Sequence, residues 1–105
     1  MAYMCQQIDS NFNVKSELVG KFLFYATKTP FEFVYTHEGD IVGIRFKGCY
    51  VPTRESMNFL ANAAAYVTDG SFIEMKGEQG EYWRYVFKGG KLKELNPKTV
   101  TIWEE

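Results

Sequence analysis

The single histidine and the two cysteines are the side chains of this sequence that could supply a base and a nucleophile. A Cys49 thiol activated by the His37 imidazole is the reaction centre that such a pair would form. However, the stretch HEGD around His37 is typical of a hairpin turn, and Cys49 lies beyond the other end of that hairpin, on the order of 30 Å away at about 3.3 Å per residue. We therefore predict no catalytic residues and expect Cys5 and Cys49 to be free thiols.

The acidic residues gather at two predicted turns. Glu38 and Asp40 stand in the first turn, and Glu78 and Glu81 stand in the second. Paired carboxylates act as acid and base when burial separates their pKa values, but turns are solvated. A calcium loop needs a regular spacing of Asp and Asn that is absent here. The sequence thus predicts that the protein is not an enzyme and has no metal site and no cofactor.

The stretch from residue 84 to 98 carries the most marked charge asymmetry of the chain. It holds five basic residues against one acid, a local charge of +4, whereas the whole chain has a net charge of -1. Lysines can hold phosphates while bases stack on neighbouring rings, which makes the hairpin 82–98 a candidate surface for single-stranded nucleic acid. Alternatively, these lysines are solvated and keep a sheet edge from pairing with other chains. The candidate binding residues are Tyr82, Arg84, Lys88, Lys91 and Lys93.

Composition points to one folded domain. The chain has 105 residues, of which 46% are hydrophobic, 24% charged and 17% aromatic. This many rings exceeds what one small core usually hides, so some are expected at the surface, around Tyr50, Tyr66 and Tyr82. The apolar runs are far shorter than the roughly 20 residues that span a bilayer, and the first residues do not form a secretory signal. We expect a cytoplasmic protein with no membrane contact.

Two segments are predicted to be helices. Residues 15–28 place Leu18, Val19, Phe22 and Leu23 at helical spacing, although Gly20 and the β-favouring run FLFY leave a strand open there. Residues 54–68 form the second helix. Thr53 is its expected N-cap, and an apolar stripe follows at Met57, Leu60, Ala64 and Val67.

Two hairpins can be registered directly from the sequence. With HEGD as a four-residue loop, the apolar pairs of the first hairpin are Phe31 with Phe46, Phe33 with Ile44, and Tyr35 with Val42, and Glu32 meets Arg45 on the other side. With residues 78–80 as a three-residue loop, the second hairpin pairs Ile73 with Tyr85, Met75 with Trp83, and Glu74 with Arg84. Gly89 and Gly90 then turn the chain into a strand at 91–95, and TVTIW at 99–103 makes the last strand.

These elements predict a single α+β domain over residues 1–105. We expect one antiparallel sheet of hairpins with one or two helices on one face, in the order α-β-β-α-β-β-β-β. Residues 1–13 are a candidate flexible segment. An offset of 41 residues aligns Phe31 with Phe72 and Gly39 with Gly80, so a tandem αββ duplication is an open alternative.

The function that this pattern favours is that of a non-catalytic protein-interaction or regulatory domain. Its partner would be a second copy of the chain or another protein, because the sequence offers surplus rings but no assembled reactive group. The alternative is single-stranded nucleic-acid binding through the basic and aromatic hairpin 82–98.

Overall fold

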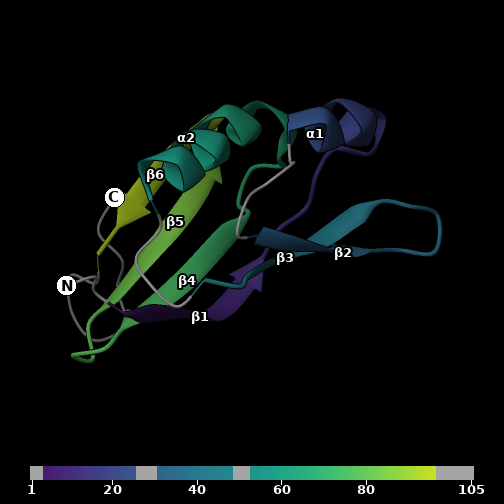
Figure 1. Ribbon diagram of the computed structural model, residues 1–105. Helices are drawn as coiled ribbons and strands as arrows, with labels where there is room; N and C mark the ends of the chain where they lie inside the picture. The colour runs from purple at the N-terminus through teal and green to yellow at the C-terminus, as the bar shows by residue number, and fades with distance from the viewer. Residues whose placement is uncertain (1–3, 26–30, 49–52, 97–105) are drawn as a thin grey trace.

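The computed structural model describes residues 4–25, 31–48 and 53–96. Within these residues the chain has an α+β fold of two α-helices and six strands (Figure 1), and the predicted fold class is confirmed. The elements are β1 (Cys5–Asn11), α1 (Val19–Tyr25), β2 (Phe31–Tyr35), β3 (Ile41–Phe46), α2 (Arg54–Ala63), β4 (Phe72–Gly77), β5 (Tyr82–Lys88) and β6 (Lys91–Leu95), with the 3-10 turns η1 (Ser16–Leu18) and η2 (Ala64–Tyr66).

The described strands form two antiparallel sheets, which corrects the expected single sheet. One sheet has four strands in the order β1-β4-β5-β6, and the other consists of β2 and β3. Helix α2 lies over the four-stranded sheet, and α1 lies beside α2, above the β2–β3 hairpin (Figure 1). The strand predicted at 99–103 lies outside the described residues.

Strand β1 corrects the expectation for residues 1–13. Residues 5–11 pair antiparallel with β4, from Cys5 opposite Gly77 to Asn11 opposite Phe72. The sequence CQQIDSN lacks the apolar alternation that reveals most strands. It forms a strand because backbone N–H and C=O groups pair whatever the side chains are, and the edge of β4 offers them partners.

The second predicted hairpin is confirmed in register. Ile73 faces Tyr85 and Met75 faces Trp83, as expected, while Glu74 faces Arg84. Its loop comprises residues 78–80, since the N–H of Gly77 donates to the carbonyl of Glu81 at 2.8 Å. The turn into β6 is also as predicted, because Gly89 and Gly90 have φ angles of 60° and 74°, which two-residue hairpin loops require.

The first predicted hairpin is right over most of its length and wrong near its loop. Phe31 faces Phe46 and Phe33 faces Ile44. Tyr35, however, faces Ile41 rather than Val42, because the register shifts after Val34. Such a bulge leaves one residue unpaired and bends the strand. Glu32 faces Arg45 as expected, but its ion pair is with Lys47 at 3.9 Å, and both side chains are exposed, so the pair adds little stability.

Both predicted helices exist, with shorter bounds. The helical alternative for residues 15–28 is the correct one, as η1 and α1 cover residues 16–25 and the remainder lies outside the described residues. Helix α2 begins after Thr53, whose hydroxyl accepts the N–H of Ser56 at 3.2 Å. The segment predicted as helix to residue 68 ends at Tyr66, because Val67 is extended and pairs with Val14.

A cluster of phenylalanines forms the centre of the core. Phe12, which is fully buried, follows β1 and contacts rings from three other elements. Its ring centroid lies 6.2 Å from that of Phe22 in α1, 6.3 Å from Phe33 in β2, and 5.5 Å from Phe87 in β5. Aromatic pairs at these separations add stability beyond their buried area. One residue after β1 thus connects both sheets and α1.

The two helix–strand–strand units differ in phase. Phe31 is buried in the core, whereas Phe72, its counterpart at the offset of 41, carries the Arg84 guanidinium over its ring on the side of the sheet away from the core. A repeat at that offset would put both residues on equivalent faces. The phase difference argues against a tandem duplication.

The side chain of Gln7 joins the two sheets. Its Nε2 donates to the carbonyl of Ile44 at 2.8 Å, and its Oε1 accepts the N–H of Phe46 at 2.7 Å. Ser10 Oγ donates to the same Ile44 carbonyl at 3.3 Å. Residues three apart normally lie on opposite faces of a strand, but the register shift at Ile8 brings Gln7 and Ser10 to the same face. The Gln7 amide thus takes the place of a neighbouring strand for β3.

We expect Gln7→Ala to lower the free energy of unfolding by about 1–3 kcal/mol, because it leaves part-buried backbone groups of β3 without their partners. Urea unfolding followed by circular dichroism measures this loss. The matched control is Gln6→Ala, which removes an exposed amide from the other face of β1 and should change stability by less than about 0.5 kcal/mol. Equal midpoints for the two variants would contradict the bridging role of Gln7.

Candidate functional site

Strands β5 and β6 bring all five candidate binding residues to the same side of the sheet. Tyr82, Arg84 and Lys88 are an even number of residues apart in β5, so their side chains leave on one side. Lys91 faces Lys88 across the ladder, and Lys93 faces Val86, which puts both lysines on that side too. The sequence contained these residues, and the register of β6 assembles them. Whether they bind a partner stays a prediction.

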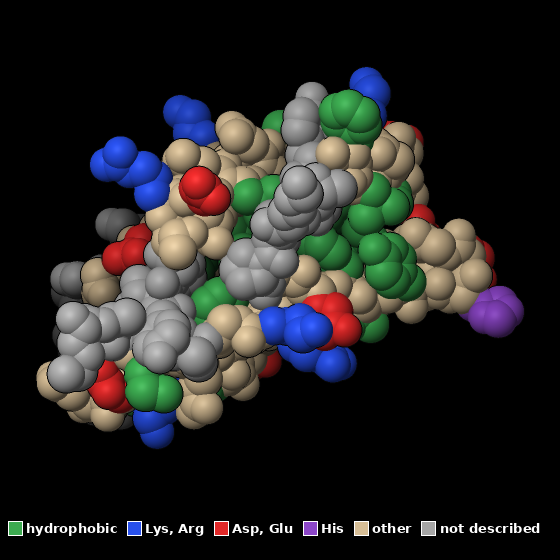
Figure 2. Space-filling model, in the orientation of Figure 1, with side chains coloured by type: hydrophobic (Ala, Val, Ile, Leu, Met, Phe, Trp, Pro, Cys, Tyr) green, Lys and Arg blue, Asp and Glu red, His purple; other side chains and the backbone are tan. Residues whose placement is uncertain are grey.

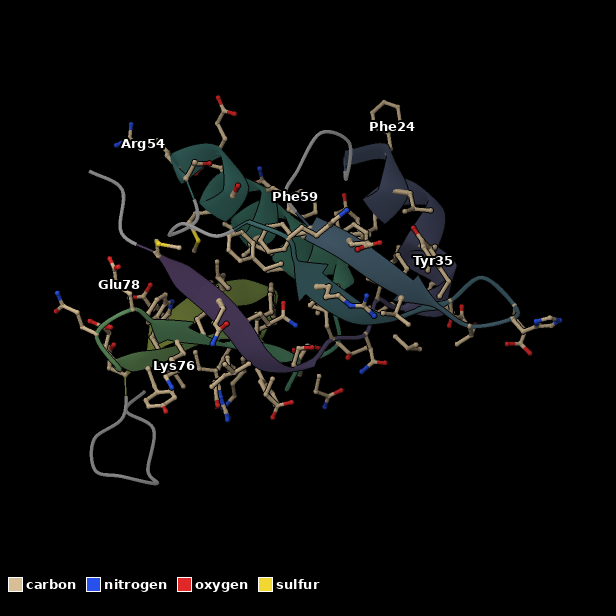
Figure 3. All side chains as sticks on the ribbon, turned by 60° about the horizontal axis from the view of Figure 1, so that its bottom comes forward. Phe24, Tyr35, Arg54, Phe59, Lys76 and Glu78 are labelled. Carbon is tan, nitrogen blue, oxygen red and sulfur yellow. The ribbon has the colours of Figure 1, made fainter. Side chains whose placement is uncertain are left out.

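We call this side of the four-stranded sheet the open face. It is opposite the side on which Tyr85 and Phe87 are buried, and α2 lies on that buried side (Figure 1). Figure 3 shows Lys76 of β4 on the side of the sheet away from α2. Among the described elements, no helix lies over the open face.

An ion pair fills the middle of the open face. Arg84 Nη2 lies 2.6 Å from Glu74 Oε1, and the Arg84 guanidinium lies over the Phe72 ring, with 4.1 Å between Cζ and the ring centroid. Both charged side chains are largely buried. Arg84 therefore has a structural role in addition to its predicted one: Glu74 compensates its charge, and the ring fixes its position.

The accessible groups lie towards the two ends of the open face. At one end Tyr82 is 42% exposed, and Lys76 Nζ lies 5.6 Å from its ring centroid. At the other end Lys88, Lys91 and Lys93 are exposed around the Gly89–Gly90 turn. Between these ends Phe72, Glu74, Arg84 and Val86 are half-buried, and Leu95 is buried. The open face thus has an aromatic end and a lysine end.

Acidic groups near the lysine end are few. Glu94, the acid within the basic stretch, faces Tyr85 and therefore belongs to the other side of the sheet. Asp69 lies at the turn, where its carboxylate accepts the N–H of Gly89 at 2.9 Å. Lys98 lies outside the described residues. The described strands give the open face five cations against two acids, with Lys76, Arg84, Lys88, Lys91 and Lys93 opposed by Asp9 and Glu74.

Strands β1 and β4 also contribute residues to the open face, and these were not among the residues predicted from the sequence. Lys76 and Phe72 could have been found, because the predicted pairing of Met75 with Trp83 already requires Lys76 to face Tyr82 on the other side. Asp9 could not have been found without knowledge that β1 is a strand.

The groups considered for catalysis do not form a site in the described part of the chain. His37 projects from the tip of the loop between β2 and β3 (Figure 2), and Cys49 lies outside the described residues. Cys5 is buried. Residues 4–25, 31–48 and 53–96 contain no cluster of three or more His, Cys, Asp or Glu side chains that could hold a metal ion. Over the same ranges no helix is long and apolar enough to cross a membrane.

A second surface surrounds α1. Phe24 is 78% exposed and points away from the molecule (Figure 3). A cleft of about 480 Å³ beside it is lined by Gly20, Lys21, Phe24 and Tyr66. Hydrophobic side chains also gather over α1 and the neighbouring β2 (Figure 2). Phe24 was absent from the predicted apolar stripe, which already implied that its ring lies on the outer side of the helix. Tyr66 was among the predicted surface rings, while Tyr50 lies outside the described residues.

Comparisons of this chain with family models, with curated proteins and with solved structures gave no match. We therefore infer the function from the geometry and charge of the open face and of the surface around α1. Of these, the open face has the more specific chemistry, since it combines cations with an exposed ring.

Burial raises the pKa of Tyr85, on the core side of β5, to about 12 from an ordinary value of 10.0. Its phenol stays neutral in the folded chain but ionises in the unfolded chain above pH 10, so this contribution to stability is complete below pH 10 and is lost as the pH rises towards 12. We expect the unfolding free energy of the native chain to fall relative to Tyr85→Phe by on the order of 1–2 kcal/mol across that window. Urea titrations at pH 8 to 12 measure the difference, and parallel curves would contradict the burial of this phenol.

Proposed function

We propose that this chain is a small non-catalytic binding domain that holds an extended anionic partner on its open face. One observation carries the proposal: the ladder between β5 and β6 places Lys88, Lys91 and Lys93 together on the open face, while Glu94 lies on the other side. These three lysines form a local positive surface on a chain whose net charge is only -1. Clustered cations of this kind attract anionic partners despite a nearly neutral whole.

The arrangement of the lysines favours a ligand over simple solvation. Lys88 and Lys91 face each other directly, and like charges in that position destabilise a sheet. Protection of an exposed edge explains lysines on β6, whereas Lys88 is the last residue of β5, beyond the point where the pairing with β4 ends at Val86. An anion bound between the lysines would relieve their repulsion.

Retention on a heparin column tests the proposal. We expect the native chain to bind heparin at low salt, where the three lysines attract its sulfates. The variant Lys88→Glu, Lys91→Glu, Lys93→Glu should elute without retention, because it replaces that attraction with repulsion between charges that act over about 10 Å at 0.1 M salt. The matched control is Lys15→Glu, Lys21→Glu, Arg54→Glu, which changes net charge equally at exposed positions elsewhere. Identical elution of the two triple variants, or a native chain that is not retained, would refute an anion site on the open face.

A second candidate function is self-association through α1. The surface around α1 carries both a protruding ring, Phe24, and a cleft bounded by Gly20 and Tyr66. A Cβ added at Gly20 would have no atom within 4 Å, so the helix surface is open to a neighbour there. A two-fold axis beside α1 would place each Phe24 in the cleft of the other copy, and contacts of this isologous kind form most homodimers. We propose a second copy of the chain as the partner of this surface.

Size-exclusion chromatography with light scattering tests self-association. We expect the native chain to have the mass of two copies and Phe24→Ser to have the mass of one, because the variant removes the ring that fills the cleft. Ile8→Ser removes an exposed apolar side chain from β1 and should leave the dimer intact. A native chain that is monomeric at 100 µM, or a dimer unaffected by Phe24→Ser, would exclude this contact.

A further inference from the structure

We infer that the anionic partner of the open face is a single strand of nucleic acid, with a base stacked on Tyr82 and phosphates bound by Lys88, Lys91 and Lys93. The inference rests on the proposed function, since it names the class of polyanion that the same face binds. Its support is the presence of an exposed ring on the face that carries the lysines.

The exposed ring distinguishes a single strand from other polyanions. Tyr82 is the first residue of β5, and its side chain lies on the open face, where it is 42% exposed. Bases of a single strand are free to stack on such a ring, and this contact tolerates any base because every base has a π face. A duplex keeps its bases stacked inside, and a run of acidic residues supplies carboxylates without a ring at each unit. A single strand carries an anion and a flat ring in every unit, so it suits Tyr82 and the lysines together.

The spacing of the two ends suits an extended strand. Tyr82 and Lys88 are six residues apart in β5, roughly 20 Å at about 3.3 Å per residue. Lys76, near the Tyr82 ring, adds a cation at the aromatic end. A few nucleotides in extended form cover this distance. Single-strand-binding domains commonly occupy 4–16 nucleotides, so a site of this length is a short one.

The middle of the open face orients the strand. Glu74, together with Asp9 opposite it in β1, makes phosphate unfavourable there. Arg84 is held over Phe72 by its bond to Glu74, so its charge is already compensated. Phosphates are therefore directed to the lysine end, while a base lies over Tyr82.

Fluorescence anisotropy of a labelled 15-nucleotide oligo(dT) tests the inference. We expect binding at low salt, with a slope of log K against log salt of about -2, as three phosphate contacts on a single strand predict. Tyr82→Ala should weaken binding by about 5- to 150-fold, the range measured for loss of one stacked base. Tyr82→Phe keeps the ring and should bind normally. Tyr35→Ala, which removes another exposed ring, that of Tyr35 in β2, should also bind normally.

Three competitors on the native chain separate the inference from the proposed function. An abasic strand of the same length, a 15-base-pair duplex and poly-glutamate should each compete less well than oligo(dT). If any of them competes equally well, or if Tyr82→Ala binds oligo(dT) as the native chain does, the single-strand inference is wrong. Lysine-dependent retention on heparin would in that case still support an anion site. Loss of both oligo(dT) binding and heparin retention would remove the proposed function as well.

Discussion

The side-chain amide of Gln7 is the contact on which the relation of the two sheets depends. An amide carries a donor and an acceptor in the same plane, as a peptide group does, and can therefore pair with a strand edge. Gln7 does so with Ile44 and Phe46, while the backbone of β1 pairs with β4. One short polar strand thereby connects the edges of two sheets. Directly after β1, Phe12 packs against phenylalanine rings of β2, β5 and α1.

Because of this connection, the helices and the second sheet pack on one face of the four-stranded sheet. Gln7, Phe12 and the helices all lie on the same side of the four-stranded sheet, so the β2–β3 hairpin also packs there. Consequently the opposite side receives no described helix. Its middle is stabilised from within, because the Arg84 guanidinium pairs with Glu74 and lies over the Phe72 ring across two neighbouring strands. A rigid centre with exposed groups at both ends suits a binding surface, since little conformational entropy remains to be lost there.

The two surfaces differ in how far their chemistry restricts a partner. The surface at α1 offers an exposed ring and a cleft, which many apolar groups could fill. The open face combines charge with a ring at a defined distance, and that combination is met by fewer ligands. The positive charge of the open face is concentrated at one end, because β6 places its lysines beside Lys88 while Glu94 lies on the opposite side of the sheet.

The sequence by itself determined much of the local structure of this protein: the hairpin from residue 72 to 88, the two-glycine turn, the Thr53 cap and the helix that follows it, whereas residues 15–28 were left open between helix and strand. These depend on residues close in the chain, where alternation, turn glycines and capping side chains act directly. The bulge after Val34 was not predictable, because the loop residues allow more than one register. Strand β1 and the division into two sheets were decided by tertiary structure alone, since they arise from backbone and amide pairing between distant segments. The candidate residues could be identified from the sequence. Their position on one face together with Lys76 and Phe72 results from the pairing of β6, β5 and β4, which the sequence pattern of any one strand does not determine.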